Sequence, residues 1–445
     1  MSGKIESSPS PSEVGFSLVS RRTLLAGAAA IAGTGVFLTA CGDDDSGSSG
    51  GGGGDVKSEV TFGSNYSDEK PKAAIQAAID TAGMTVKVNT VDHNTYQENF
   101  NTYIQQPDDV VCWFAGYRMR AFAGKGVVGD VSDVWTKLTG LSEGFKSAAS
   151  GLDGKQYFVP LYFYPWAVHY RKSLFEEKGY AIPKTWDELL ALCEKMKADD
   201  IIPFAAANDG GWPQMGMFDM INLRTNGYDF HVSLMGGKES WTDPKVKQVF
   251  TNWSTITDYY QPDVNGRTWQ DAATALGNKE VGMYLLGTFV TSNFDPSKDD
   301  KAQEIIDDIT FFAFPEIDAA HGQDAVEAPI DGFMMAKSPK NEAGAKALLE
   351  KLGSAAAIDA YISKDPSVVA ANSGAKTDAY SALQKASAEL VGSAKYIAQF
   401  LDRDTDPDFA ANVVGKGLTD FLADPSKIDD ILSTIEEQKK TYTFE

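Results

Sequence analysis

The chain has 445 residues, 43% of them hydrophobic, and a formal net charge of −22 at pH 7. Its length exceeds that of one ordinary domain, so we expect two domains or one two-lobed body. The acidic balance disfavours nucleic acid and anionic membrane surfaces as partners. With three cysteines in the chain, a cysteine framework or a cysteine-based zinc site is excluded by count.

The first 40 residues have the pattern of an export signal. Arg21 and Arg22 precede an apolar run that ends in the sequence LTAC at Cys41. A basic pair, a short apolar core and small residues at its end are typical of a signal peptide, and the paired arginines favour the twin-arginine route. LTAC resembles a bacterial lipobox, so we expect cleavage before Cys41 and acylation of this cysteine. The alternative is a transmembrane anchor, for which the apolar run is short and rich in Ala and Gly.

The next segment, residues 41–57, is predicted to be a flexible tether, since most of it consists of Ser, Gly and Asp. The mature chain is therefore expected outside the cytoplasm, held by a lipid at the outer face of the cell membrane.

From residue 58 onward, apolar strands alternate with amphipathic helices. Strands are predicted near 58–65, 84–92 and 109–114, and helices near 68–83 and 94–106. Strands that are apolar throughout and separated by helices are typical of a parallel sheet covered on both faces. The predicted fold class is α/β.

A second α/β unit is predicted to begin near Pro160. Its strands are expected near 167–170, 201–208, 280–286, 309–314 and, more weakly, 332–336, and the last 80 residues are predicted to be mostly helical. Thr185 and Glu188 form a capping box at the start of one helix. Cys112 and Cys193 are better explained as two buried free thiols than as a disulfide.

Four motifs resemble family 1 extracellular solute-binding proteins, the maltose-binding-protein-like lipoproteins that bind carbohydrate for ABC importers. Residues 159–208 resemble the central signature, from Val159–Pro160 to the Pro-Lys-Thr-Trp-Asp-Glu helix start, with Arg171 where Asn is usual. NKEVGMYLLGTF, FFAFPEID and the segment from Ala328 to Ser354 follow in the family's order, with Phe289 where Trp is usual. The resemblance extends over about residues 58–440.

The resemblance implies a two-lobed periplasmic-binding-protein-like fold of type II, with hinge-linked lobes and a central ligand cleft. By this analogy the first lobe comprises about 58–161 plus 313–362, and the second about 162–312 plus 363–445. It also implies a monomer with a carbohydrate ligand, the transmembrane subunits of an ABC permease as partners, and neither cofactor nor bound metal.

Sugar sites need flat aromatic platforms and polar groups that bind hydroxyls, and ligands of open α/β sheets lie beyond the carboxyl ends of the strands. Aromatic and polar residues stand at several of those predicted ends, although core packing is the alternative for every aromatic. A turn is the alternative for Asp331, which the resemblance favours as a ligand contact, and a surface salt bridge is the alternative for Arg403. The candidate ligand-binding residues are Asn65, Tyr66, Asp92, His93, Trp113, Phe114, Tyr162, Tyr164, Trp166, Asp209, Trp212, Trp269, Phe289, Asp331 and Arg403.

These features predict a lipoprotein that captures a sugar or oligosaccharide and delivers it to an ABC permease. Two alternatives stay open: a membrane-anchored glycan hydrolase, and the same binding module for a non-sugar solute. Enzyme motifs are weak, because GLSEG lacks the preceding strand of a nucleophile elbow and SDEK lacks its partner motifs. The four histidines show no metal-ligand spacing.

Overall fold

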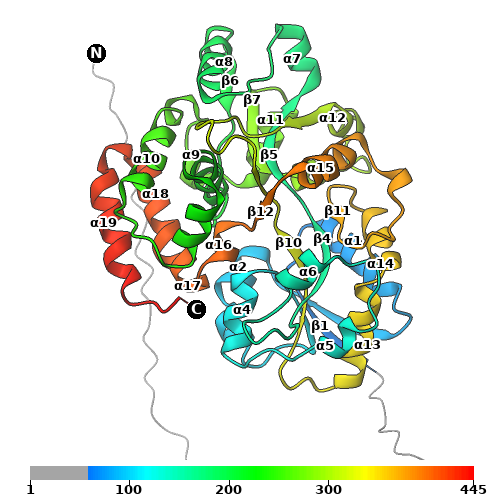
Figure 1. Cartoon of the computed structure of the whole chain (residues 1–445). Coiled ribbons are helices and arrows are strands. Elements are labelled where there is room, and N and C mark those ends of the chain that lie inside the picture. Colours follow the sequence, from blue (N-terminus) through cyan, green and yellow to red (C-terminus); the bar gives the residue numbers. More distant parts are fainter. Residues whose placement is uncertain (1–58, 445) are drawn as a thin grey trace, which may run out of the picture. The chain divides into compact units, whose positions relative to one another are not determined.

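A computed structural model describes residues 59–444. The expected signal segment, Cys41 and the whole tether therefore lie outside the described residues. In the described part, two β-sheets with covering helices organise the chain, as expected for the α/β class (Figure 1). We call the sheet that contains the first strand, with its helices, the first lobe, and the other sheet with its helices the second lobe.

The first lobe is built on a mixed sheet. Three of its strands are the apolar runs predicted to be parallel, and β1 does pair in parallel with β2 and β3. A later strand, β10, instead runs antiparallel to β3 and β4, because the chain returns from the second lobe in the opposite direction. In spatial order the strands are β11 (Val369–Ala370), β4 (Val159–Phe163), β10 (Ile330–Met335), β3 (Val110–Phe114), β1 (Glu59–Ser64) and β2 (Thr85–Thr90).

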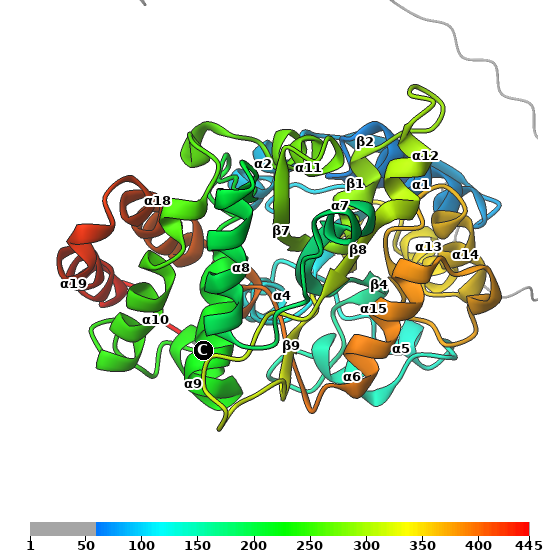
Figure 2. The ribbon, with the colours of Figure 1, turned by 90° about the horizontal axis from the view of Figure 1, so that it is seen from above.

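Helices cover the first sheet with small and apolar residues. α1 has Pro71 in its first turn and buries Ala74, Ile75, Ala78 and Ile79. Figure 2 shows α1 beside α13 and α14, two helices from a distant part of the sequence that contact it. The helices of this lobe are α1 (Glu69–Asp80), α2 (His93–Glu98), α3 (Phe100–Tyr103), α4 (Tyr117–Gly124), α5 (Ser132–Trp135), α6 (Glu143–Ala148), α13 (Glu342–Leu352) and α14 (Ala355–Ile362).

The second lobe contains a four-stranded sheet whose central strands are buried. In order the strands are β6 (Ile202–Phe204), β7 (Val281–Gly287), β5 (Trp166–Arg171) and β8 (Ile309–Phe312). The predicted capping box is present, since Thr185 Oγ1 accepts from the backbone of Glu188, whose carboxylate reaches back to the cap. The helices are α7 (Lys172–Lys178), α8 (Trp186–Ala198), α9 (Met215–Met235), α10 (Pro244–Ser254), α11 (Trp269–Gly277) and α12 (Ala302–Asp308).

The C-terminal part is largely helical, as predicted. Short strands β9 (Ala325–Glu327) and β12 (Tyr396–Ala398) pair in parallel where the chain passes between the lobes. Figure 2 shows α18 and α19 on the side of the second lobe where α10 lies, and α19 contacts α10. The helices are α15 (Ala382–Ser393), α16 (Leu401–Asp404), α17 (Pro407–Phe409), α18 (Gly415–Ala423) and α19 (Ile428–Lys439).

The chain passes between the two sheets more than once. It leaves the first sheet after β4, returns with β10, and leaves again after β11. The strand β11 at residues 369–370 pairs with β4 of the first sheet, although the expected boundaries place these residues in the second lobe. The lobe boundaries expected from the sequence stay a prediction. Cys112 and Cys193 are both buried free thiols, as predicted. In the described part of the chain, no helix has the length and apolar character to cross a membrane.

Candidate functional site

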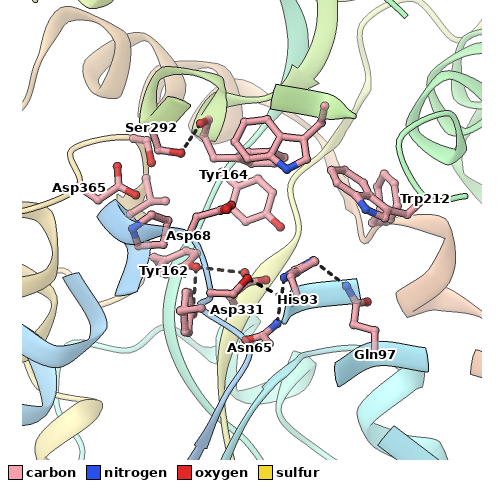
Figure 3. A pocket seen from close by; sticks show the side chains of 18 of the residues that line it. Asn65, Asp68, His93, Gln97, Tyr162, Tyr164, Trp212, Ser292, Asp331 and Asp365 are labelled. Atoms are coloured by element: carbon pink, nitrogen blue, oxygen red, sulfur yellow. Dashed lines mark hydrogen bonds between the residues drawn. The ribbon is translucent and has the colours of Figure 1, made fainter. Parts of the chain in front are cut away.

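A cavity of about 120 Å³ is lined by residues of both lobes (Figure 3). The first lobe contributes side chains that follow β1 and β2, and the second contributes aromatic side chains at the ends of β5 and β7. Most of the predicted ligand-binding residues line it, namely Asn65, Tyr66, His93, Tyr162, Tyr164, Trp166, Trp212, Trp269, Phe289, Asp331 and Arg403.

Arg403 is the centre of the polar side of the cavity. It lies on α16, and its Nη1 donates to Asp331 Oδ1 at 2.8 Å while Nη2 donates to the Tyr164 hydroxyl at 3.0 Å. The guanidinium carbon lies 3.8 Å from the ring centroid of Phe114. Burial disfavours the charged form of Arg403, but Tyr164, Asp331 and Asp402 outweigh it and hold the pKa above its ordinary value. Arg403 is therefore a fixed, charged donor rather than a surface ion pair.

A set of hydroxyl groups continues this network into the first lobe. Tyr162 Oη lies 3.2 Å from Asp331 Oδ2 and 3.0 Å from Tyr66 Oη. Burial raises the pKa values of Tyr66 and Tyr162 well above their usual range. Both phenols are therefore neutral at physiological pH and can donate or accept hydrogen bonds.

The opposite wall of the cavity is aromatic. Trp166 stacks on Phe400 with ring centroids 4.7 Å apart, and Trp212 stands perpendicular to Trp166 at 6.4 Å. Phe289 lies between Trp212 and Trp269, at 6.2 and 5.3 Å. Trp212, Trp269 and Phe289 are only half-buried, so parts of their rings are open to a ligand.

His93 forms a third side of the site. Its Nδ1 lies 3.3 Å from Asn65 Nδ2, and its Nε2 lies 2.7 Å from Gln97 Nε2 (Figure 3). Burial lowers the pKa of His93 to about 4, with smaller contributions from Arg403 and Arg118. The imidazole is therefore neutral at pH 7 and acts as a hydrogen-bonding group rather than a charge.

Four predicted residues do not line this cavity. Trp113 is buried in the core and stacks on Phe100 with centroids 3.5 Å apart. Phe114 is buried and packs under Arg403. Asp92 is exposed and accepts a hydrogen bond from the backbone of Thr95 as the N-cap of α2, and Asp209 is exposed in the loop after β6. Core packing accounts for Trp113 and Phe114, and helix capping accounts for Asp92. Asp209 is exposed to solvent.

The cavity also contains residues that the sequence analysis missed. Asp402 adjoins Arg403 in the chain, and Gln97 lies one helical turn after His93, so both positions carried a signal. Residues between α14 and β11 carried none, because only the fold brings this loop to the cavity. The missed lining residues are Ser67, Asp68, Pro71, Gln97, Ser292, Tyr361, Asp365, Ser367, Val368, Phe400 and Asp402.

Two carboxylates of the site are held by arginines. Asp331 pairs with Arg403, and Asp402 Oδ2 accepts from Arg118 Nη1 at 2.8 Å. Among residues 59–444, no group of three or more His, Cys, Asp or Glu side chains is arranged to hold a metal ion. Neutral hydroxyls, one charged donor and aromatic faces are groups that bind an uncharged polyhydroxylated molecule.

Two lobes with a ligand-sized cavity between them define a solute-binding protein of type II. The profile of the family described as bacterial extracellular solute-binding protein matches residues 66–359. The chain belongs to this family.

Curated relatives include several sugar-binding proteins. The multiple sugar-binding protein of Streptococcus mutans is 27% identical over 237 residues, 52% of this chain and 54% of that protein. A probable sugar-binding periplasmic protein of Mesorhizobium japonicum is 26% identical over 190 residues, 41% of this chain and 45% of the other. The matches span about half or less of the length of these relatives.

Solved structures match more of the chain. The bacterial solute receptor AcbH, which has an exclusive substrate preference for β-D-galactopyranose, is 43% identical with a TM-score of 0.82, covering 86% of this chain and 98% of its own. A chitin oligosaccharide binding protein has the same fold, with a TM-score of 0.77 at 20% identity over 86% of this chain and 98% of that chain.

Proposed function

We propose that this protein binds a sugar or oligosaccharide between its lobes and delivers it to an ABC permease. The observation that carries this proposal is the pairing of a charged hydrogen-bonding cluster, Arg403 with Asp331 and Tyr164, with half-buried tryptophans across one cavity. Sugars present hydroxyl pairs and apolar C–H faces, which these two walls match. The AcbH and Streptococcus mutans relatives support a sugar over another solute.

We propose further that the residues lining the cavity are the ligand contacts and that the ligand bridges the lobes. Ligand then stabilises the closed arrangement by the difference in its affinity for the closed and open states. The proposed lobes are 58–161 plus 313–362 and 162–312 plus 363–445, with β11 as a segment of the second range that pairs in the first sheet.

Binding without cleavage is part of the proposal. A glycosidase needs two carboxyl groups about 5–10 Å apart, one of them free to hold a proton. Asp331 and Asp402 are instead ion-paired with Arg403 and Arg118. Burial raises the pKa values of the two other carboxyl groups that line the cavity, Asp68 and Asp365, so recovery of the sugar unchanged is the test of binding without cleavage.

Thermal-shift and calorimetric screening against mono- and oligosaccharides tests the function. A ligand present at 100 times its Kd should add roughly 2.7 kcal/mol to the free energy of unfolding. Recovery of the sugar unchanged by chromatography after hours of incubation supports a receptor. A cleaved sugar would contradict the receptor function. If only a non-sugar solute stabilised the protein, the proposed sugar ligand would be wrong.

We also propose that export uses the twin-arginine route and that a lipid on Cys41 anchors the mature monomer. Cys41→Ala should release the protein or leave it unprocessed, which fractionation and mass spectrometry detect. Replacing Arg21 and Arg22 by Lys should block export. Normal membrane attachment of the Cys41 variant would contradict the anchor.

A further inference from the structure

A second cavity adjoins the first, and a few side chains separate the two. Its volume is about 370 Å³, and it extends between α2, β3 and α4 on one side and the loop after β6 and residues 407–412 on the other. Gln97, Trp212 and Asp402 line both cavities. Both spaces therefore lie along one cleft, and the residues they share decide whether a ligand can extend through it.

Gln97, Arg118 and Asp402 form a hydrogen-bonded barrier, which we call the Gln97 partition. Arg118 Nη1 donates to Gln97 Oε1 at 2.7 Å and to Asp402 Oδ2 at 2.8 Å. Figure 3 shows Gln97 at the edge of the site, joined to His93. The three side chains come from α2, α4 and α16, so the partition spans the cleft from lobe to lobe.

The partition is held in place by burial. The Arg118 and Asp402 side chains are only 5% and 12% exposed, and the Arg118 guanidinium lies 4.6 Å from the Trp113 ring centroid. Moving Arg118 away would leave a buried carboxylate unpaired, which is costly. Gln97 is tied at both ends of its amide, to Arg118 and to His93. A ligand therefore meets a fixed wall rather than a mobile side chain.

The volume on the near side of this wall suits one sugar ring. One water molecule needs about 10–15 Å³ of cavity volume. The first cavity, of about 120 Å³, therefore holds roughly eight to twelve water molecules. A sugar ring therefore has room on this side of the wall, and a second ring linked towards α4 would have to pass the partition into the second cavity. We propose that the Gln97 partition restricts the ligand to a single sugar ring, and that Gln97 is a specificity-determining residue. This inference rests on the proposed sugar-binding function.

Titration calorimetry with common aldohexoses and the disaccharides that contain them tests the partition. The wild type should bind its preferred hexose roughly 100-fold more tightly than any of these disaccharides, because the second ring meets the wall. Gln97→Ala removes one of the three side chains of the partition and widens the passage between the cavities, so disaccharide affinity should rise by about tenfold or more. Gln97→Asn, which keeps a shorter amide, should give a smaller rise. Gln76→Ala, on the exposed face of α1, is the matched control and should bind like the wild type.

The possible outcomes distinguish a failure of the partition from a failure of the proposed sugar-binding function. Equal affinity of the wild type for a hexose and a disaccharide would overturn the partition and leave sugar binding intact. Two Gln97 variants that melt like the wild type and bind hexose, with no gain for disaccharides, would overturn the role of Gln97. If Gln97→Ala alone is unfolded in the melting curve, the disaccharide affinity of Gln97→Asn tests the role of Gln97, and no rise in that affinity would overturn it. A wild type that binds none of these sugars would overturn this inference, and one that also binds none of the other mono- and oligosaccharides of the thermal-shift screen would overturn the proposed function.

Discussion

Arg403 connects side chains that are remote in the sequence, since Asp331 and Tyr164 lie 72 and 239 residues away. Arg403 thus orients acceptors from two other chain segments before any ligand arrives. Such preorganisation reduces the entropy lost on binding. The aromatic wall differs, because its half-buried rings contact one another and are partly exposed.

Two tryptophans near the cleft should respond oppositely to truncation. Trp212→Ala should weaken sugar binding by about 2 kcal/mol or more with little loss of stability, because this ring is half-buried in the cavity. Trp113→Ala should cost about 3–5 kcal/mol of unfolding free energy, because its ring is 1% exposed and stacked on Phe100. Calorimetry and urea denaturation of both variants provide the comparison. A Trp113 variant of normal stability that fails to bind would reverse the assignment.

His231 provides a pH prediction. Burial lowers its pKa from 6.5 to about 4, and burial raises the pKa of the neighbouring Asp219 well above its usual range. Because the unfolded chain binds a proton at His231 more tightly than the folded state, stability should fall as the pH drops from 6.5 towards 4. His231→Gln lacks this titration, so the wild type should lose on the order of 3 kcal/mol relative to the variant across that window. Urea denaturation at several pH values measures the difference. If the free energy of unfolding of the wild type instead rose relative to the variant as the pH fell, His231 would be charged and paired with Asp219.

At the scale of elements, β10 links the core to the site. It lies between β3 and β4, and its register with β4 shifts between Asp331 and Gly332. The shift turns Asp331 to the cavity while Gly332 packs against the backbone of Val159. A side chain at Gly332 would overlap the Val159 carbonyl oxygen and the Phe158 ring.

Gly332→Ala should therefore cost about 1–3 kcal/mol of stability and weaken sugar binding by moving Asp331. Gly392→Ala near the end of α15 is the matched control, because a methyl group there meets no neighbouring atom within 4 Å. The control should be neutral or gain up to about 1 kcal/mol, since Ala is the better helix former. Thermal melts and calorimetry compare the two. A Gly332 variant as stable as the Gly392 variant would contradict the packing argument.

Elements with a local signal could be predicted from the sequence. The apolar run at 109–114 predicted β3, and the capping box predicted the start of α8. The direction of β10 and the β9–β12 pairing had no such signal, because each depends on partners from distant parts of the chain. Candidate site residues were found where aromatics follow strands. Trp113 fits that pattern too, but the packing of Phe100 against it is a tertiary fact that no local pattern contains.

At the scale of the whole described body, the lobes also touch at the rim of the cleft. Asn101 Nδ2 donates to Asp408 Oδ1 at 2.7 Å, Gln270 Nε2 lies 3.4 Å from Asp68 Oδ2, and Lys298 pairs with Glu69. These groups are largely exposed, and exposed pairs contribute only about 0–1 kcal/mol each. The rim contacts are therefore weak, and apart from the buried Arg118–Asp402 and Arg403–Asp331 pairs the closed arrangement should depend on the ligand.

Small-angle scattering should show this dependence. We expect the radius of gyration to fall when the correct sugar saturates the protein, because hinge closure brings two rigid lobes together. A disaccharide rejected in calorimetry should leave the curve unchanged and serves as the control. Superimposable curves with and without the bound sugar would contradict a closing clamp.

The return of the chain through β10 also has a consequence for how the molecule comes to be folded. β3 and β10 are about 220 residues apart in the sequence, and β4 lies between β10 and β11, both of which follow it in the chain. During synthesis, the edges of β3 and β4 that later pair with β10 and β11 remain unpaired. Unpaired apolar strand edges are sites of aggregation. Pairings across such long loops also form slowly. The strands of the second sheet all come from the continuous segment 166–312, so this sheet can complete its pairing during synthesis while the first sheet still lacks β10 and β11.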